Sequence, residues 1–382
     1  MDAQATAVFL RYFDELKDPR RHNVRHVFCD ILTIAILAVM SRADDWREIH
    51  EYASGREPWL RTFLSLPKGI PCADTFRRVF ARIDPLAFER CFIAWTQALS
   101  QCTEGSEGRF IAIDGKTLRR SFQHAWAKQG LHLVSAWCDS NQVVLGQLAV
   151  EAKENEIVAI PKLLELLNLK GAIVTIDAMG CQKDIAQAIR QKQAHYVLAV
   201  KDNQRLLHEK VKSLMDDAIR EKFKGLEGDA CESTEGGHGR IETRRVWCTP
   251  EVKWLGEAKE GWCDLRSVGA VECVREDLST GKTSTERRYF IASLDGTDAD
   301  GFGAAVRQHW GVENKVHWVL DVGFGEDQSR IRKGHGAENF SRLRRIVLNK
   351  LRNFDTQRRV SLKTKRYRCL IDCQYLLDAL KQ

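Results

Sequence analysis

The sequence predicts a mixed α/β protein with an all-helical N-terminal region. Apolar residues recur at helical spacing over the first hundred residues. Short apolar runs typical of strands start at residue 109, and strand and helix patterns then alternate. With 382 residues, of which 44% are hydrophobic, the chain is long enough for two or three domains.

The first hundred residues are expected to form helices. The segment Ile31–Met40 is almost wholly apolar and predicts a buried helix. Asp74 precedes an apolar-periodic segment and is expected to cap a helix there, and Pro85 opens another. The polar stretch 101–108 contains glycine and predicts a linker, which separates a helical domain at 1–100 from the rest.

The middle of the chain predicts a sheet. Two strands follow the first one as a meander, and strands then alternate with helices. The strands are expected at residues 109–114, 132–138, 143–150, 172–177 and 195–200, with helices at 156–167 and 184–192. A mostly β insertion is expected at about 205–290, followed by helices at 300–319 and 339–352.

Basic residues are concentrated near the C-terminus. The net charge is +7, but residues 328–368 hold fourteen Lys or Arg against two acidic residues. Basic C-terminal helices over this window are typical of a polyanion-binding protein. The alternative is a solvated basic helix face.

The twelve cysteines are scattered and form no CxxC pair, which predicts reduced core residues rather than disulfides or zinc ligands. The N-terminal residues lack the apolar segment of a signal peptide, and the longest apolar run is too short to span a membrane. A cytoplasmic protein is therefore expected.

Two aspartates each follow a buried apolar run. Asp114 ends the run Ile111-Ala-Ile-Asp, and Asp177 ends Val174-Thr-Ile-Asp. Both carboxylates are expected at strand ends in an open sheet, where sites form. Neighbouring buried carboxylates repel, so a divalent cation is expected between them, and oxygen ligands suit Mg²⁺ or Mn²⁺. The alternative is that each aspartate caps a turn.

A third acid, Glu313, lies in a predicted helix. His309, Glu313 and His317 recur every four residues and share one helix face. Two alternatives stay open here. One is a His-Glu-His zinc site, although the HExxH pattern is absent. The other is a structural helix in which Trp310 and Trp318 pack into the core.

At this point the chain resembles the ISAs-type transposases, also called H-repeat-associated or Rhs-linked proteins. The matching motifs run nearly end to end: Asp18-Pro-Arg-Arg-His, Asp45-Trp-Arg-Glu-Ile, Gly69-Ile-Pro, Asp74-Thr-Phe-Arg-Arg-Val-Phe, Ala112-Ile-Asp-Gly-Lys-Thr, Asn155-Glu-Ile-Val-Ala-Ile-Pro, Asp177-Ala-Met-Gly-Cys-Gln, Lys201-Asp-Asn-Gln, His238-Gly-Arg-Ile-Glu-Thr-Arg, His309-Trp-Gly-Val-Glu-Asn and Trp318-Val-Leu-Asp-Val.

The resemblance implies a DDE transposase of an insertion sequence. It implies an RNase H-like catalytic domain at 108–382, with the β insertion before the last catalytic helix, and a helical, DNA-binding domain at 1–100. Asp114, Asp177 and Glu313 map onto the catalytic, metal-binding acids. Two Mg²⁺ ions are the expected cofactors, for which Mn²⁺ can substitute. The activity implied is metal-dependent DNA cleavage and strand transfer at the element ends.

The resemblance also implies partners and a location. The partners are double-stranded DNA, as terminal repeats and target, and a second copy of the chain in a synaptic homodimer. The protein is expected in the bacterial cytoplasm, on the nucleoid when bound to DNA. The alternatives are a catalytically silent or domesticated DNA-binding protein and a non-mobile RNase H-like nuclease.

One departure concerns the Tyr–Arg–Glu–Lys signature of related enzymes, because Val306, His309 and Leu320 stand at its other positions. The phosphate contacts of that signature therefore need substitutes. The candidate DNA-binding residues are Lys116, Arg240, Arg244, Arg307, His309, Lys315, His317, Arg330, Arg332, Lys333, Arg342, Arg344 and Arg345. Lys116 is alternatively a solvated turn lysine, and Arg240, Glu242 and Arg244 alternatively form a surface ladder.

Overall fold

A computed structural model gives the fold and describes residues 9–21, 24–101, 108–121, 130–151, 154–237, 239–354, 357 and 360–381. The chain forms two compact units. Unit 1 comprises residues 1–104, 115–153 and 313–382, and unit 2 comprises 105–114 and 154–312. Residues 102–107 of the predicted linker lie outside the described residues.

The N-terminal helices of unit 1 form where the apolar spacing predicts them. They are η1 (Arg11–Phe13), α2 (Phe28–Met40), α3 (Trp46–Ser54), α4 (Glu57–Leu60), α5 (Ala73–Phe80) and α6 (Pro85–Gln101). Asp45 caps α3, because its side chain accepts hydrogen bonds from the backbone N–H groups of Arg47 and Glu48. The predicted cap at Asp74 is wrong: Cys72 is the capping residue of α5, and Asp74 instead pairs with Arg77 and Arg78.

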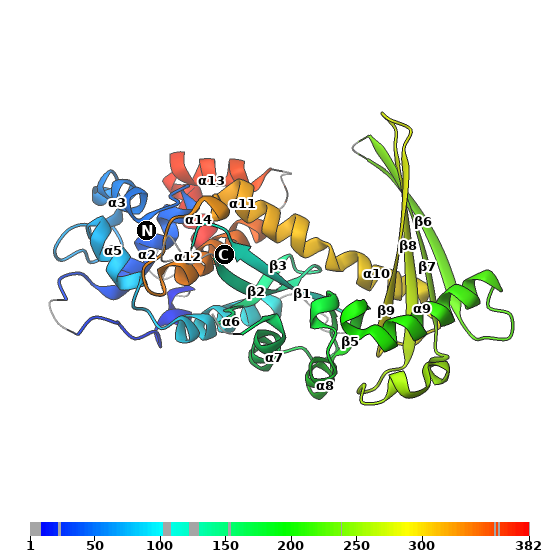
Figure 1. Ribbon diagram of the computed structural model, residues 1–382. Coiled ribbons are helices and arrows are strands. Elements are labelled where there is room, and N and C mark those ends of the chain that lie inside the picture. The colour runs from blue at the N-terminus through cyan, green and yellow to red at the C-terminus, as the bar shows by residue number, and fades with distance from the viewer. Residues whose placement is uncertain are drawn as a thin grey trace. The chain divides into compact units, whose positions relative to one another are not determined.

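The C-terminal helices belong to the same unit as the N-terminal ones. They are α11 (Trp318–Phe324), η6 (Glu326–Gln328), α12 (Gly336–Asn353), α13 (Leu362–Ile371) and α14 (Cys373–Lys381). Helix α12 is buried along almost its whole length and packs on α2, α5 and α6, so chain ends far apart in sequence share one core (Figure 1). Residues 1–104 therefore belong to the same compact unit as residues 115–153 and 313–382.

Strand β1 (Phe110–Leu118) contributes to both units. The later part of β1 belongs to unit 1. There β2 (Leu131–Cys138) lies next to β1 in the sheet and pairs antiparallel with β3 (Val143–Ala149), so the strand order is β3-β2-β1. In unit 2 its first part pairs in parallel with β4 (Ile173–Ile176), which pairs in parallel with β5 (His195–Val200). An antiparallel meander leading into parallel strands is the topology of an RNase H-like fold, as predicted.

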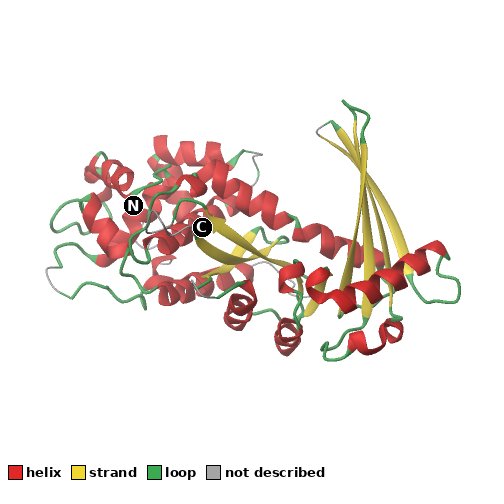
Figure 2. Ribbon diagram, in the orientation of Figure 1, coloured by secondary structure: helices red, strands yellow, loops and turns green. Residues whose placement is uncertain are grey.

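The predicted β insertion is present in unit 2. Strands β6 (Asp229–Gly237), β7 (Arg240–Thr249), β8 (Ser267–Asp277) and β9 (Thr283–Ala292) form an antiparallel meander, and β9 pairs with β5. The sequence missed β6, because its glycine-containing end resembles a turn. The strands extend past the helices that pack on them (Figure 2).

The helices of unit 2 are α7 (Glu156–Leu166), η2 (Ala178–Gly180), α8 (Lys183–Gln191), η3 (Asp202–Gln204), α9 (Arg205–Arg220), η4 (Val252–Lys259) and α10 (Ala299–His309). Helix α10 packs on β4, β5, β6 and β7 through a cluster that includes Phe302 and Val306. Among the helices that the structure describes, none combines the length and apolar character that a membrane span requires.

Candidate metal centre

Asp114 and Asp177 each follow a residue of a paired position on neighbouring parallel strands. The register pairs Ile113 of β1 with Ile176 of β4, and each aspartate follows directly. The sequence placed both residues at strand ends. For Asp177 this holds, because β4 ends at Ile176, but β1 continues past Asp114 to Leu118.

Asp177 caps a turn. Its Oδ1 accepts hydrogen bonds from the backbone N–H groups of Met179, at 3.0 Å, and Gly180, at 3.4 Å. Burial raises the pKa of its carboxyl, and the nearby Glu156 carboxylate adds to this effect. The turn-capping role that the sequence left open for the aspartates is therefore present here, although a capping carboxylate still has a second oxygen.

Glu313 opens an irregular turn between α10 and α11. Residues Glu313–His317 form a π-helix, an arrangement that is frequent at functional sites. The wider turn places Glu313 against His317, whose Nδ1 lies 3.0 Å from Glu313 Oε2. The His317 side chain is buried, whereas that of Glu313 is 59% exposed. The single helix predicted over 300–319 is therefore interrupted at the glutamate.

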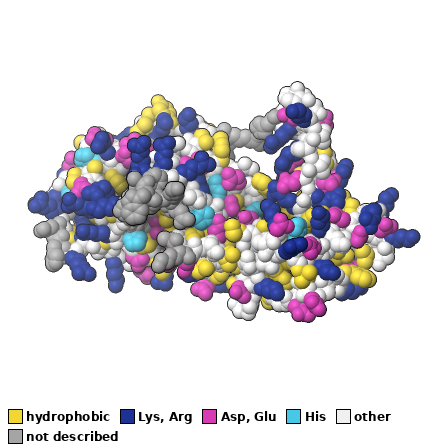
Figure 3. Space-filling model, in the orientation of Figure 1, with side chains coloured by type: hydrophobic (Ala, Val, Ile, Leu, Met, Phe, Trp, Pro, Cys, Tyr) yellow, Lys and Arg dark blue, Asp and Glu magenta, His cyan; other side chains and the backbone are white. Residues whose placement is uncertain are grey.

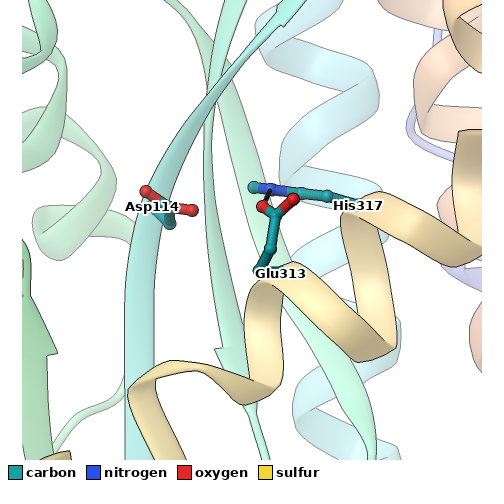
Figure 4. Close-up of side chains that lie close together, drawn as sticks. All are labelled: Asp114, Glu313 and His317. Atoms are coloured by element: carbon teal, nitrogen blue, oxygen red, sulfur yellow. Dashed lines mark hydrogen bonds and ion pairs between the residues drawn. The ribbon is translucent and has the colours of Figure 1, made fainter. Parts of the chain in front are cut away.

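Asp114, Glu313 and His317 bring their ligand atoms together. A carboxylate oxygen of each acid and a ring nitrogen of His317 all lie within 4.8 Å of one another. Figure 4 shows Asp114 projecting from its strand towards the other two side chains, which come from consecutive turns of one helical segment. Two carboxylates and an imidazole suit a divalent cation. Asp177 is not part of this group.

Lys116 does not sit on the surface as a solvated turn lysine. It is buried, its Nζ lies 2.5 Å from Asp321 Oδ1, and it donates a hydrogen bond to the backbone carbonyl of His317 at 3.3 Å. A third partner is Glu326 Oε2, at 3.4 Å. Lys116 is thus unavailable to a phosphate in this conformation, and it fixes the π-helical turn to β1 instead.

Glu326 is a fully buried acid that sequence reasoning missed, as it missed Asp321. Burial by itself would raise the pKa of Glu326, but Arg345 and Lys116 outweigh it and lower this pKa to about 2. Its Oε1 accepts a hydrogen bond from Ser341 at 2.8 Å and pairs with Arg345 at 3.0 Å. No local sequence pattern separates such an acid from a surface one, because its partners are distant in sequence.

The three arginines of α12 are not DNA contacts in this structure. Arg342, Arg344 and Arg345 are fully buried, and the Nε of Arg342 lies 2.5 Å from Glu89 Oε2. That prediction is wrong because charge density along the sequence does not show which charges are neutralised inside the fold. Lys350, Lys365 and Arg366 of the same basic window are also buried, and Arg358 and Arg359 lie outside the described residues.

Several other DNA-binding candidates are held by partners within their own unit. His317 is buried against Glu313, and Lys315 Nζ lies 2.7 Å from Asp139. His309 Nδ1 is 3.1 Å from Thr175 Oγ1, and burial lowers the pKa of His309 to about 4, so the ring is neutral at pH 7.

On the β insertion, Glu242 and Arg244 form ion pairs at the surface, which was the alternative to DNA binding. Arg244 pairs with Glu242 at 2.7 Å, and both Arg244 and Arg307 pair with Glu235. Arg240 is exposed at the start of β7.

Arg330, Arg332 and Lys333 lie between η6 and α12. Arg330 and Lys333 are exposed. Arg332 is half-buried, and its Nε donates to the carbonyl of Arg120 at 2.9 Å. Of the C-terminal candidates, these three are the ones that the structure leaves at the surface.

Comparison with known proteins identifies relatives along the whole chain. Residues 10–96 match the family model described as DDE_Tnp_1-associated, and residues 105–350 match "Transposase DDE domain". The chain is 42% identical over 385 residues to "Putative transposase YncI" of Escherichia coli O157:H7, covering 97% of this chain and 94% of that protein. It is 37% identical to "H repeat-associated putative transposase YhhI" of Escherichia coli strain K12, covering 94% of this chain and 93% of that protein.

A solved structure, a piggyBac transposase synaptic complex with hairpin DNA, aligns with a TM-score of 0.41 and 10% identity over 98% of this chain and 77% of that one. This likeness is too weak to support an argument. The DDE-domain match covers more than half of the chain, and the relatives match it almost from end to end. The resemblance to H-repeat-associated proteins is thereby confirmed, and the chain belongs to the DDE transposase family.

Proposed function

We propose that this transposase cleaves the ends of an insertion sequence and joins them to target DNA, with Asp114, Asp177 and Glu313 as its metal-binding acids. The observation that supports this most directly is the gathering of Asp114, Glu313 and His317 ligand atoms within 4.8 Å. Asp177 is proposed as the third acid, because it directly follows Ile176, which pairs with Ile113 next to Asp114.

The carboxylate oxygens of Asp114, Asp177 and Glu313 fit hard divalent cations, and we propose two Mg²⁺ ions, with Mn²⁺ as a substitute. When bound, such ions would stabilise the negative charge that develops on the attacking and leaving oxygens at phosphorus. Asp114, Asp177 and Glu313 would hold the ions. His317 is proposed to orient the Glu313 carboxylate through their 3.0 Å contact.

The proposed partners are double-stranded DNA, as element ends and as target, and a second copy of the chain in the synaptic complex. Arg240, Arg330, Arg332 and Lys333 remain the proposed phosphate contacts. The protein is proposed to work in the bacterial cytoplasm, where it would meet its DNA. The N-terminal helices are proposed to contribute to DNA binding.

The test is an end-cleavage and joining assay on DNA that carries the terminal repeats flanking the gene. With Mg²⁺ or Mn²⁺, the wild-type protein is expected to nick at the element end and to join the freed 3′-hydroxyl to a target duplex. A chelator should abolish both products. Specific binding without cleavage under all metal conditions would indicate a silent, DNA-binding transposase derivative, and cleavage without joining would indicate a nuclease.

Lys116 is proposed as a positioning residue rather than a phosphate contact. Replacement by Met (Lys116→Met) removes the link from β1 to the His317 carbonyl and to Asp321. We expect a loss of about 10- to 100-fold in cleavage rate or metal affinity, as for other groups that orient ligands. DNA affinity and its salt dependence should not change.

A second variant, Asp321→Asn, breaks the same contact from the other side and should reproduce the metal effect. Lys116→Arg keeps the charge and should restore part of the rate. If Lys116→Met instead flattens the salt dependence of DNA binding and leaves the metal requirement unchanged, the lysine contacts a phosphate, as the sequence suggested.

A further inference from the structure

Unit 1 contains a cavity of about 870 Å³, and its lining includes Arg330, Arg332 and Lys333, which are proposed above as phosphate contacts. Its wall comes from three segments that are distant in sequence. These are residues 44–48 at the start of α3, residues 73, 74 and 77 of α5, and residues 325 and 328–333 between α11 and α12. All three segments belong to unit 1, so the cavity lies within one compact body.

Basic side chains line this cavity. They are Arg47, Arg77, Arg330, Arg332 and Lys333. Arg47, Arg330 and Lys333 are exposed, and none of these three forms a salt bridge with another described residue. Figure 3 shows Lys and Arg side chains gathered over the part of unit 1 that carries α3 and α5. Unpaired, exposed cations from both α3 and the 328–333 segment therefore border one hollow.

The acidic residues of the wall are engaged by the protein itself. Asp45 caps α3, and Glu48 accepts a hydrogen bond from the backbone N–H of Asp44 at 2.6 Å. Asp44 pairs with Arg366 at 3.0 Å, and Asp74 pairs with both Arg77 and Arg78. Asp44 and Asp74 are thus paired with arginines, whereas Asp45 and Glu48 are held by backbone N–H groups and keep their charge. Arg47, Arg330 and Lys333 are the exposed cations of the wall.

The lining segment is firmly anchored. It follows Glu326, which is buried and holds both Lys116 and Arg345. Lys116 lies two residues along the chain from Asp114. The segment 328–333 is therefore linked, through Glu326 and Lys116, to the strand of the candidate metal centre.

We infer that this cavity binds the sugar–phosphate backbone of double-stranded DNA, with Arg47 of α3 acting together with Arg330 and Lys333. The inference rests on the proposed function and names the N-terminal helix that contacts DNA. Guanidinium and ammonium groups recognise phosphates by charge and hydrogen bonding, and such contacts set the position of the protein without reading sequence. The cavity thus holds flanking DNA, whereas sequence recognition lies elsewhere.

The test compares two triple variants with equal charge change. The cavity variant is Arg47→Gln/Arg330→Gln/Lys333→Gln. The control is Lys210→Gln/Lys212→Gln/Lys222→Gln, which removes three exposed lysines in or just after α9. Dissociation constants are measured against salt concentration for an element-end duplex and for an unrelated duplex of the same length. Thermal unfolding midpoints confirm that both variants are folded.

The cavity variant is expected to lower the slope of log affinity against log salt by about 2 to 3, close to 0.9 for each phosphate that the protein no longer neutralises. The loss of affinity should be the same on both duplexes, because interactions with the DNA backbone carry no sequence information. The control should keep the wild-type slope. An unchanged slope in the cavity variant, or an equal loss in the control, would overturn the inference.

Failure of the proposed function would look different. If wild-type protein neither cleaves nor joins DNA under any metal condition while the cavity variant still loses its salt slope, the cavity binds DNA but the catalytic proposal is wrong. If cleavage is intact and the slope is unchanged, the catalytic proposal stands and the cavity inference is wrong.

Discussion

Changing Glu313 to Gln, or Asp114 to Asn, is expected to reduce metal-dependent cleavage of element-end DNA by about a thousandfold or more. Each substitution keeps the size of the side chain and removes one anionic ligand from the group that lies within 4.8 Å. Metal ions contribute several kcal/mol of transition-state stabilisation, and each 1.36 kcal/mol corresponds to roughly tenfold in rate. The measurement is single-turnover cleavage at saturating DNA across a range of Mg²⁺ and Mn²⁺ concentrations.

Binding of the same DNA without metal is the internal control and should stay within about twofold of wild type, because the change is confined to metal ligands.

Asp177→Asn and His317→Gln complete the series. If Asp177 is a ligand, its variant should fall as far as Glu313→Gln. If His317 only orients Glu313, its variant should lose about 10- to 100-fold. Full activity in Glu313→Gln or Asp114→Asn would remove that residue from the centre.

Breaking the ion pair between Arg342 and Glu89 is expected to destabilise the protein by about 3–5 kcal/mol. Both side chains are completely buried, with Arg342 Nε 2.5 Å from Glu89 Oε2. Burial acts to lower the pKa of Arg342, but Glu89 and Glu338 outweigh it and raise this pKa, so the arginine stays charged. Arg342→Met leaves the Glu89 carboxylate buried without its partner. Urea unfolding of wild type and variant measures the loss.

The double variant Glu89→Leu/Arg342→Met should recover most of this stability, because an apolar pair of similar volume often replaces a buried ion pair without cost. It should also keep the wild-type salt slope of DNA binding, since Arg342 is buried away from DNA. If Arg342→Met instead leaves the unfolding free energy unchanged and flattens that slope, α12 binds DNA and opens to do so.

These tests separate the two roles that basic residues play in the C-terminal region. In the sequence, residues 328–368 form one basic window, but in the fold some of its basic side chains are buried and others are exposed. Arg342 and Arg345 pair with buried acids, and Arg344 is buried over the Phe340 ring. Arg330 and Lys333 are exposed beside the cavity. A charge run thus predicted a polyanion-binding surface but did not show which of its members belong to that surface.

Local patterns determined most of the secondary structure and part of the site. Helical spacing located α2, α3 and α6, and alternating or apolar runs located β1 to β5, because a repeat of 3.6 or 2 residues reflects which side of an element is buried. The same runs singled out Asp114 and Asp177, which follow the paired residues Ile113 and Ile176 of neighbouring strands. The motifs along the chain identified the transposase family, which the comparisons confirm.

The tertiary structure alone decided which charges meet. Lys116 and Asp321 are 205 positions apart, and Glu89 and Arg342 are 253 apart, so no local repeat could pair them. The four-residue spacing put Glu313 and His317 on one helix face, but nothing in that spacing indicated that the turn between them is π-helical. Periodicity reports burial along one element, whereas ion pairing depends on how distant elements pack, and at that level the fold separates buried, paired charges from exposed ones.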